Sequence, residues 1–461
     1  MPDLYSLPGI DHAIIIPRKQ HNISRQAISP NALKVLYRLN KAGFTGFLVG
    51  GSVRDLLLGK SPKDFDIATD ASPEEIRQIF RNSRIIGRRF KIVHVRFGRE
   101  IIEVTTFRAH HEASNRIDKH VPKRKIRGLD SAHTNEGMIL RDNVYGSIDE
   151  DSLRRDFTVN ALYYTPNGFS VLDFNNGMQD IVNRQIRIIG DPVARYREDP
   201  VRMLRAIRFA AKLDFDIEQD TAAPIQKLGD LLLSIAPARL YDEILKLFYS
   251  GHAVKIFEML KSSGLGQYLI APTLESIECC PPAAAKMLHL ALENTDQRIA
   301  DSKSVSPHFL FAALLWPLLC RKREQAKRDN QDQRSNFLPM ANQVISTQLA
   351  ITAIPRRVSY ASRDIWEMQW KLEHPTRRNA LSTLNHTCFR AAYDFLLLRE
   401  AAGEDLGRCG QWWTDFQLSD TNQQEKTLES LSNPRRRRRQ RNKGRKKINP
   451  GTSRHNHKDG I

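Results

Sequence analysis

Residues 47–70 read FLVGGSVRDLLLGKSPKDFDIATD, and the rest of the chain is organised around this stretch. A strand is expected to end at Gly50 and Gly51, and a short helix is expected to follow over residues 53–58. Two aspartates, Asp64 and Asp66, come soon after this helix. On one strand their carboxylates would share a face, because successive strand side chains point to opposite sides. The stretch therefore predicts a strand, a turn and a helix beside a carboxylate pair.

The length and charge of the chain indicate several domains and a polyanionic partner. At 461 residues the chain exceeds what a single core usually supports. Its formal net charge is +19, although its hydrophobic fraction of 41% is ordinary for a globular protein. Residues 434–461 carry twelve Lys and Arg against one acid, so this tail is expected to be disordered and to contact RNA. The tail residues predicted to bind RNA are Arg435, Arg436, Arg437, Arg438 and Arg439.

Cysteine content and apolar runs favour a cytoplasmic protein. The five cysteines are odd in number and include no CxxC pair, which favours reduced thiols. The N-terminal apolar run covers only residues 13–16 and is too short for a secretory signal. The most apolar stretch, residues 309–320, is too short to span a bilayer, so we expect a buried helix and no transmembrane segment.

Hydrophobic periodicity places the opening stretch in a domain that mixes strands and helices. Ser29 and Pro30 precede a helical pattern over residues 32–43, and Ser72 starts another helix that is expected to reach about residue 82. A hairpin around Gly98 is expected to bring Glu103 onto a neighbouring strand. The other expected elements are hairpin strands over 91–97 and 100–107, strands over 44–49, 169–173 and 186–189, a mobile loop over 109–135, and helices from residue 191 almost to the end.

These patterns divide the chain into five segments. A head that mixes strands and helices is expected after a short N-terminal extension, and two helical segments, a neck and a body, and a basic tail follow it. The predicted bounds are 1–30 for the extension, 31–190 for the head, 191–255 for the neck, 256–430 for the body and 431–461 for the tail.

Three carboxylates are candidates for a metal site. Aspartates two residues apart are usually surface charges, but Asp64 and Asp66 flank an aromatic residue at a predicted strand, and Glu103 is expected opposite them. Hard carboxylate oxygens together with a triphosphate suit Mg²⁺. We therefore predict that Asp64 and Asp66 are ligands of a two-ion magnesium site, which would activate a ribose 3′-hydroxyl and stabilise departing pyrophosphate.

The glycine turn is a candidate phosphate site. A glycine pair before a helix is often no more than a tight turn. At this position, however, Gly50 and Gly51 would let backbone amides approach a phosphate, and the helix start would add its positive end. Arg54 would supply a fork of donors one helical turn further on.

The run RRDFTVN, residues 154–160, is a second candidate for nucleotide binding. Without its context it would be interpreted as a salt-linked helix face. Arg155 and Asn160 are predicted to hold the triphosphate and the sugar, and Asp156 is predicted to support catalysis rather than to bind metal.

A third candidate lies in REDPVRMLRAIRFAAKL, residues 197–213. Its charged residues recur every third position and are expected to form a stripe on one helix, which could also be an exposed salt-bridged surface. One acid and several arginines could instead recognise a nucleobase edge and bind phosphates. The residues of this stripe are Asp199, Arg202, Arg205 and Arg208.

With these residues assembled, the chain resembles the tRNA nucleotidyltransferase and bacterial poly(A) polymerase family, the class II branch of the polymerase-beta-like nucleotidyltransferases. The motifs LVGGSVRDLLLG, DFD, EVTTFR, RRDFTVNAL and EDPVRMLRAIRFAAKL occur in family order. The resemblance implies an α+β fold: a catalytic nucleotidyltransferase head with a mixed β-sheet, an all-helical neck that selects the nucleotide and binds RNA, an all-helical body that binds RNA, and a disordered basic tail. It also implies metal binding by Asp64 and Asp66, a third carboxylate from Glu103, active-site support from Asp156, and nucleotide contacts from Gly51, Arg54, Arg155, Asp199, Arg202, Arg205 and Arg208.

The core motifs do not separate poly(A) addition from CCA addition to tRNA, and the flanking sequence decides between them. Flanking segments such as PARLYDEILKL and FRAAYDFLLLR resemble the poly(A) polymerase subgroup from near residue 12 to about residue 415. The resemblance implies an enzyme that adds AMP from ATP to RNA 3′ ends without a template, releases pyrophosphate and promotes RNA decay. We expect a monomer with ATP, RNA 3′ ends and RNA-decay proteins as partners. The alternatives are a CCA-adding tRNA nucleotidyltransferase and, from another class, a non-catalytic RNA-binding protein.

Overall fold

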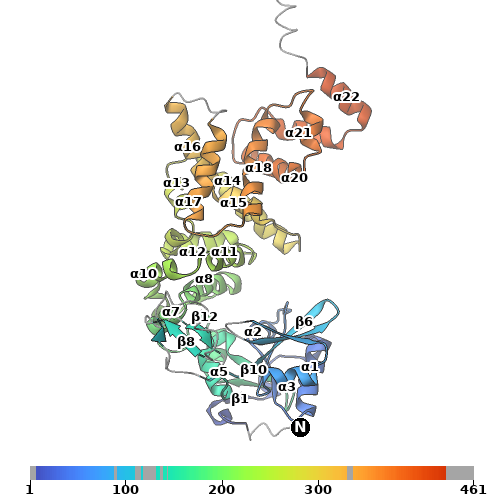
Figure 1. Ribbon diagram of the computed structural model, residues 1–461. Coiled ribbons are helices and arrows are strands. Elements are labelled where there is room, and N and C mark those ends of the chain that lie inside the picture. Colours follow the sequence, from blue (N-terminus) through green and yellow to red (C-terminus); the bar gives the residue numbers. More distant parts are fainter. Residues whose placement is uncertain are drawn as a thin grey trace, which may run out of the picture. The chain divides into compact units, whose positions relative to one another are not determined.

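The computed structural model describes residues 7–87, 91–109, 116–117, 131–134, 139–142, 144–329 and 336–431 (Figure 1). The chain divides into two compact units. The first comprises Met1–Leu274, Thr295–Lys303 and Ala350–Ala353, and the second comprises Glu275–Asn294, Ser304–Leu349 and Ile354–Ile461. Within the described residues, no helix combines the length and the apolar character needed to cross a bilayer.

The first unit contains a mixed eight-stranded sheet, as the α+β prediction requires. The strand order is β1-β11-β10-β2-β3-β6-β5-β4. Neighbouring strands are antiparallel except for β3 and β6, which are parallel. The strands are β1 (Ile14–Ile16), β2 (Gly46–Val49), β3 (Asp66–Thr69), β4 (Ser83–Ile86), β5 (Ile92–Phe97), β6 (Glu100–Thr106), β10 (Leu162–Thr165) and β11 (Ser170–Asp173).

The two faces of the sheet pack against different hydrophobic clusters, because side chains alternate along each strand. Leu48 and Tyr164 belong to one cluster, which also includes residues of α1 (Pro30–Lys41) and α3 (Pro73–Ile79). Val49 and Tyr163 belong to the other cluster. Asp66 is the register partner of Val49, so its carboxylate emerges on this second face.

Local capping explains where the first helices begin. The Ser29 hydroxyl accepts hydrogen bonds from the backbone at the start of α1, and Ser72 and Glu75 form a capping box at α3. Both predicted helix starts are confirmed, although α3 ends at Ile79, three residues before its predicted end. The predicted hairpin of β5 and β6 is also confirmed.

Several strand predictions are wrong in detail. Strand β3 begins at Asp66, so Asp64 lies in the preceding segment and alternation along one strand does not relate the two carboxylates. Strands β1, β4 and β10 lie where no strand was expected, and the strand expected over 186–189 is observed only at Gln185–Ile186. The described parts of the expected loop contain β7 (Arg116–Ile117) and β8 (Ser131–Thr134), which form a three-stranded sheet with β9 (Ile139–Asp142).

The chain after the sheet is mainly helical, as predicted. One part of this prediction is wrong, because a two-residue strand, β13 (Asp216–Ile217), interrupts the expected run of helices. It pairs in parallel with another two-residue strand, β12 (Gln185–Ile186). The helices that position the site are α2 (Gly51–Leu57), α5 (Ile148–Arg154), α7 (Pro192–Glu198), α8 (Val201–Leu213) and α11 (Pro237–Phe248). The other α-helices of the described residues before position 301 are α6 (Gly177–Val182), α9 (Gln219–Ala222), α10 (Ile225–Leu228), α12 (Ala253–Ser262), α13 (Ala271–Ile277) and α14 (Pro282–Ala300).

The helices after residue 301 pack around buried tryptophans. Trp366 donates a hydrogen bond to the Ala312 carbonyl, and Trp413 donates one to the Leu372 carbonyl. Residues 309–320, the most apolar stretch, lie in two buried helices rather than the single one that was expected. These helices are α15 (Pro307–Leu314), α16 (Trp316–Arg328), α17 (Phe337–Leu349), α18 (Arg356–Glu373), α19 (Ala380–Leu384), α20 (Phe389–Ala401), α21 (Cys409–Leu418) and α22 (Thr421–Ser430).

Candidate active site

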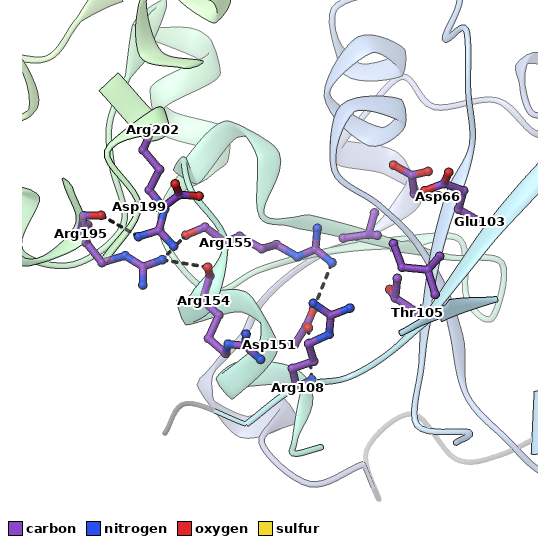
Figure 2. A pocket seen from close by; sticks show the side chains of 12 residues that line it. Asp66, Glu103, Thr105, Arg108, Asp151, Arg154, Arg155, Arg195, Asp199 and Arg202 are labelled. Atoms are coloured by element: carbon purple, nitrogen blue, oxygen red, sulfur yellow. Dashed lines mark hydrogen bonds and ion pairs between the residues drawn. The ribbon is translucent and has the colours of Figure 1, made fainter. Parts of the chain in front are cut away.

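Two adjoining cavities in the first unit collect the predicted site residues of the head and neck. The larger has a volume of about 730 Å³, and the smaller has a volume of about 300 Å³. Both are lined by Asp66 and Arg155, and Figure 2 shows the residues that line the smaller one. The larger is also lined by Gly50, Gly51, Arg54, Asp64, Asp156, Asn160, Asp199, Arg202, Arg205 and Arg208, and the smaller by Glu103. The five tail arginines predicted to bind RNA lie outside the described residues.

The carboxylates of Asp66 and Glu103 lie side by side at the edge of these cavities (Figure 2). The two residues are register partners on the parallel strands β3 and β6. Although the Asp66 side chain reaches solvent, its pKa is raised to about 6, first by burial and then by the charges of Glu103 and Asp64, against the opposing effect of Arg155. The site therefore concentrates negative charge that a cation would neutralise.

The donor chemistry of this carboxylate group fits a magnesium ion that is held partly by substrate. No group of three or more His, Cys, Asp or Glu within the described residues is arranged to hold a metal ion. Magnesium is usually bound by one or two carboxylates, several waters and substrate phosphates rather than by a complete protein cage. Asp64 and Asp66 are therefore suitable ligands once a triphosphate is present, with Glu103 beside them.

The glycine turn adopts a conformation that only glycine reaches easily. Gly50 has φ 74° and ψ −134° at the junction between β2 and α2. A β-carbon at this position would be 3.7 Å from the Arg155 Nη1 atom, which is an ordinary contact. The requirement for glycine therefore comes from the backbone conformation and not from a lack of space.

Arg54 is fixed inside the protein rather than extended toward solvent. Its Nε and Nη2 atoms donate to the Asp55 carboxylate at 2.9 and 2.6 Å, and its Nη1 atom donates to the Asn160 side chain. The guanidinium also lies 5.3 Å from the centre of the Phe209 ring. All three guanidinium nitrogens of Arg54 therefore have partners within the protein. One of these partners is Asn160, which is predicted to bind the sugar.

Arg155 is held at the cavity by a buried polar pair. Its Nε atom donates to the Tyr163 hydroxyl at 2.9 Å, and its Nη2 atom donates to the Asp151 carboxylate at 3.0 Å. Burial alone would lower the pKa of Arg155, but Tyr163 and the Asp151 charge hold it above its ordinary value. The side chain extends toward Asp66 and Glu103 (Figure 2), so a permanent positive charge faces the carboxylates.

Asp156 joins the head to helix α8. Its Oδ2 atom accepts from Arg205 Nε at 2.6 Å, and its Oδ1 atom accepts from Asn160 at 3.2 Å and from the Phe157 backbone at 2.9 Å. Burial would raise the pKa of Asp156, but the Arg205 ion pair and these hydrogen bonds hold it below its ordinary value. Both oxygens are engaged within the protein, which agrees with a supporting role more than with metal binding.

The predicted charged stripe is interrupted. Asp199 directly follows the last residue of α7, and Pro200 lies between it and α8, so Asp199 does not share a helix with the arginines. A salt bridge of 2.8 Å joins Asp199 to Arg239 on α11. Arg202 is also engaged, because its Nη1 atom donates to Glu198 and to a backbone carbonyl of α7.

Arg208 differs from its neighbours because part of its guanidinium has no partner. Its buried Nε atom makes no hydrogen bond to any described residue. The pKa of Arg208 is lowered, first by burial and then by the charge of Arg205. Both guanidiniums lie over Phe209, at 5.1 Å for Arg205 and 4.9 Å for Arg208. Arg208 is therefore a buried donor that lines the larger cavity and remains available to a ligand.

Sequence reasoning missed the residues that hold the predicted site in place. Tyr163 and Arg239 lack a spacing signal, since each contacts a residue on another element. Asp151 could have been found, because it lies four residues before Arg155, which is the spacing of a helical ion pair. His94 could have been found, because the register of the predicted hairpin places it opposite Glu103. Its Nε2 atom is 3.0 Å from the Glu103 carboxylate.

Profiles of known families match three parts of the chain. A profile described as Poly A polymerase head domain matches residues 46–187. A second, Probable RNA and SrmB- binding site of polymerase A, matches residues 214–277. A third, Polymerase A arginine-rich C-terminus, matches residues 329–447 and so includes the five predicted tail arginines.

The curated relatives include two kinds of enzyme, and these differ in how much of the chain they match. The chain is 47% identical to Poly(A) polymerase I of Salmonella typhimurium, over 93% of this chain and 91% of that protein. It is 46% identical to Poly(A) polymerase I of Escherichia coli O6:H1, over 92% and 90%. Identity to the CCA-adding enzyme of Lactobacillus helveticus is 36% and covers about half of each chain, 51% and 54%.

Solved structures agree with the fold. The crystal structure of the Bacillus stearothermophilus CCA-adding enzyme in complex with CTP is similar with a TM-score of 0.53 and 25% identity, covering 84% of this chain and 82% of that chain. A tRNA nucleotidyltransferase complexed with a primer tRNA and an incoming ATP analog gives a TM-score of 0.54 at 20% identity, over 84% and 100%. The sequence identity over nearly the whole chain decides between the two kinds: this protein belongs to the bacterial poly(A) polymerase family and is a nucleotidyltransferase.

Proposed function

We propose that the protein adds AMP from ATP to RNA 3′ ends without a template. One observation carries the proposal: the carboxylates of Asp66 and Glu103 (Figure 2) lie at cavities whose walls are rich in arginine and include Arg155 and Arg208. Carboxylates without such a lining would bind metal, but they would not hold a triphosphate. The lining without the carboxylates would bind RNA, but it would not promote phosphoryl transfer.

The reaction forms one bond and breaks another at the α-phosphorus of ATP. The RNA 3′-hydroxyl oxygen forms a new bond to this phosphorus. The bond between the α-phosphorus and the oxygen that bridges it to the β-phosphate breaks, so pyrophosphate leaves. Bound magnesium would neutralise the triphosphate and lower the pKa of the attacking hydroxyl. Asp64 and Asp66 are the residues proposed to hold it, and Glu103 is the third carboxylate.

The protein side chains have separate tasks in this proposal. Arg155, anchored by Asp151 and Tyr163, binds the triphosphate as a fixed positive charge. Asn160 contacts the sugar while Arg54 and Asp156 fix its amide from both ends. Arg208 offers its buried Nε–H to the nucleobase or a phosphate.

Base selection is assigned to Asp199 together with the arginines of α8. Arg239 fixes one oxygen of the Asp199 carboxylate, which sets the direction of this acceptor in the cavity. A carboxylate acceptor and a guanidinium donor at fixed positions can distinguish the amino edge of adenine from other bases. The same pair provides no means of counting additions, so the length of the product is not set here.

The competing function is CCA addition to tRNA. A CCA-adding enzyme requires CTP as well as ATP and stops after one adenosine. The relatives with that name match about half of this chain, whereas the poly(A) polymerases match more than nine-tenths of it. Coverage therefore favours poly(A) addition, with RNA polyadenylation and decay in the bacterial cytoplasm as its proposed role.

A primer assay tests the proposal directly. Purified protein is given a generic RNA primer, magnesium and each nucleotide alone, with an Asp64→Asn variant as the inactive control. The expected result is a long ladder with ATP alone and no extension by the variant, which still binds RNA. Dependence on a tRNA end and CTP would show a CCA-adding enzyme, and equal RNA binding without any extension by either protein would show a non-catalytic binding protein.

A further inference from the structure

A second cavity, separate from the candidate active site, lies in the first unit beside the start of α1. Its volume is about 650 Å³, within the range of small-molecule sites. The residues that line it come from the segment before α1, from α1 itself and from the hairpin of β10 and β11. They are Arg18, Ile23, Ser24, Arg25, Gln26, Leu33, Tyr37, Tyr164 and Phe169.

This cavity lies on the opposite face of the sheet from the carboxylates. Tyr163 is on the side of Asp66, and its hydroxyl holds Arg155 at the active site. Tyr164, the next residue of β10, points to the other face and lines the second cavity. The two sites therefore share a strand but not a face, and a ligand in one does not fill the other.

Exposed aromatic rings form part of the cavity wall. Phe169 is 37% exposed, and Tyr37 is 36% exposed. Phe169 also has a positive φ of 52°, a conformation that is uncommon for a bulky side chain. The hairpin thus accepts an unfavourable backbone conformation at a residue whose ring is open to solvent. Such rings are typical platforms for stacking nucleobases.

The polar part of the wall is cationic. Arg25 lies 5.5 Å from the centre of the Phe169 ring and donates to the Tyr37 hydroxyl at 3.0 Å. Arg18 donates from Nη1 to the His21 carbonyl at 2.7 Å. None of the described residues that line this cavity is acidic. An anionic group would therefore be attracted and would meet no opposing carboxylate in the wall.

Tyr164 contributes a buried hydroxyl that has no partner. The side chain is fully buried, and its Oη atom makes no hydrogen bond to any described residue. Burial raises its pKa, with a further upward effect from Tyr37 that Arg18 and Arg25 oppose, so the hydroxyl remains protonated at neutral pH. Buried hydroxyls nearly always have a partner, so this hydroxyl in the cavity wall can form a hydrogen bond with a ligand atom.

We propose that this cavity binds one nucleotide unit, with its base stacked on Phe169 and Tyr37, a polar base atom on the Tyr164 hydroxyl, and its phosphate at Arg18 and Arg25. The nucleotide is either one residue of an RNA chain or a free nucleoside monophosphate. Both sources present the same aromatic base and anionic phosphate. The proposal does not depend on the reaction assigned to the active site, since it concerns a different face of the sheet.

Equilibrium binding by the full chain, without divalent metal, tests the proposal and separates the two sources. The RNA probe is a fluorescein-labelled oligoadenylate of twelve nucleotides followed by anisotropy, and the free-nucleotide probe is AMP followed by calorimetry. The variants are Phe169→Asn, which suits the positive φ but lacks the ring, Arg25→Ala and the conservative Tyr164→Phe. Arg77→Ala is the matched control, because it removes an exposed arginine from α3 away from the cavity.

For an RNA residue in the cavity, we expect Phe169→Asn and Arg25→Ala each to weaken oligoadenylate binding about tenfold. Tyr164→Phe should weaken it about threefold, and Arg25→Ala should reduce the steepness of the salt dependence by about one phosphate contact. For a free nucleotide, the oligoadenylate affinity stays unchanged, but AMP binding falls from two sites per chain to one in Phe169→Asn.

Unchanged binding of both probes by Phe169→Asn and Arg25→Ala would overturn the proposal, as would an equal loss in Arg77→Ala. Far-ultraviolet circular dichroism and primer extension at saturating RNA show whether each variant is folded. Because Tyr164→Phe removes a single oxygen, it tests the hydroxyl even if the other variants lose structure. A protein that lacks polymerase activity but shows these binding losses would refute the proposed function and leave this inference standing.

Discussion

Asp151→Asn is the substitution that best tests how the active site is built. Asp151 was not among the residues predicted from the sequence, and it is assigned no direct contact with substrate. Its Oδ2 atom accepts hydrogen bonds from Arg155 at 3.0 Å and from the Tyr163 hydroxyl at 2.7 Å. Asparagine keeps the size and one acceptor oxygen, so the substitution removes the charge that holds Arg155 and leaves the packing nearly intact.

The expected loss follows from the kind of hydrogen bond that is changed. A hydrogen bond to a charged group contributes about 1.5–3 kcal/mol, whereas a neutral one contributes about 0.5–1.5 kcal/mol. The difference of about 1–2 kcal/mol corresponds to a decrease of about 5- to 30-fold in kcat/KM for ATP. Tyr163→Phe should cost less, about fivefold, because the Asp151 charge still holds Arg155 after the Tyr163 hydroxyl is removed.

Single-turnover primer extension at varied ATP concentration measures this loss, and a double-mutant cycle assigns it. If Asp151 acts by holding Arg155, Asp151→Asn should change kcat/KM by less than twofold when Arg155 is already alanine. Asp149→Asn on the same helix is the control, because Asp149 pairs with His12 and does not line the cavity. A full loss from Asp151→Asn in the absence of Arg155 would refute the reasoning.

Three further substitutions test separate parts of the site. Gly50→Ala should destabilise the first unit by about 1–3 kcal/mol more than Gly51→Ala, as measured by its thermal midpoint, because only Gly50 has a positive φ; equal midpoints would contradict this. His94→Phe should lower extension about 10-fold and raise the magnesium concentration for half-maximal rate, since Glu103 loses its hydrogen bond; recovery in His94→Gln separates positioning from packing. Arg208→Ala should raise the KM for ATP about 10-fold without lowering the thermal midpoint, because its buried Nε has no partner among the described residues; a large loss of stability would show a structural role instead.

The sequence predicted the elements that depend on local chemistry. The start of α1 follows from the Ser29 cap and the start of α3 from the Ser72 capping box, and the hairpin around Gly98 follows from alternation on both sides of a glycine. The short strand β4 was missed although Asn82 and Gly87 flank it, because its four residues do not alternate between polar and apolar side chains. The true start of β3 at Asp66 was also missed, because a strand edge is set by pairing with β2 and β6 rather than by the sequence of β3.

The charged residues of the candidate site could be predicted from the sequence, but some of the residues that hold them in place could not. Charged residues in short motifs are noticeable in a sequence because a buried charge needs a partner that compensates it. The compensating partners do not stand out: Arg239 reaches Asp199 across 40 positions of sequence, and Arg205 reaches Asp156 across 49. Such pairs depend on how helices pack, and packing is a property of the whole fold.

The contacts that hold the site residues in place also change the interpretation of the predicted motifs. Arg54 bonds to Asn160, Asn160 bonds to Asp156, and Asp156 forms an ion pair with Arg205 on α8. This chain of contacts connects the glycine turn, which was assigned to phosphate, with the helix that was assigned to the base. Phe209 reinforces the connection, because the Arg54 and Arg205 guanidiniums both lie over its ring.

The residues proposed for phosphate placement and those proposed for base selection are therefore connected by contacts within one unit of the protein. A substitution at Arg205 leaves Asp156 without its cation, and Asn160 and Arg54 then lose a fixed neighbour. Its effect should appear in the discrimination between nucleotides and in the rate with ATP together, because the same contacts serve both. Separate control of the two would require a residue outside this chain of contacts, and Arg239 at Asp199 is such a residue.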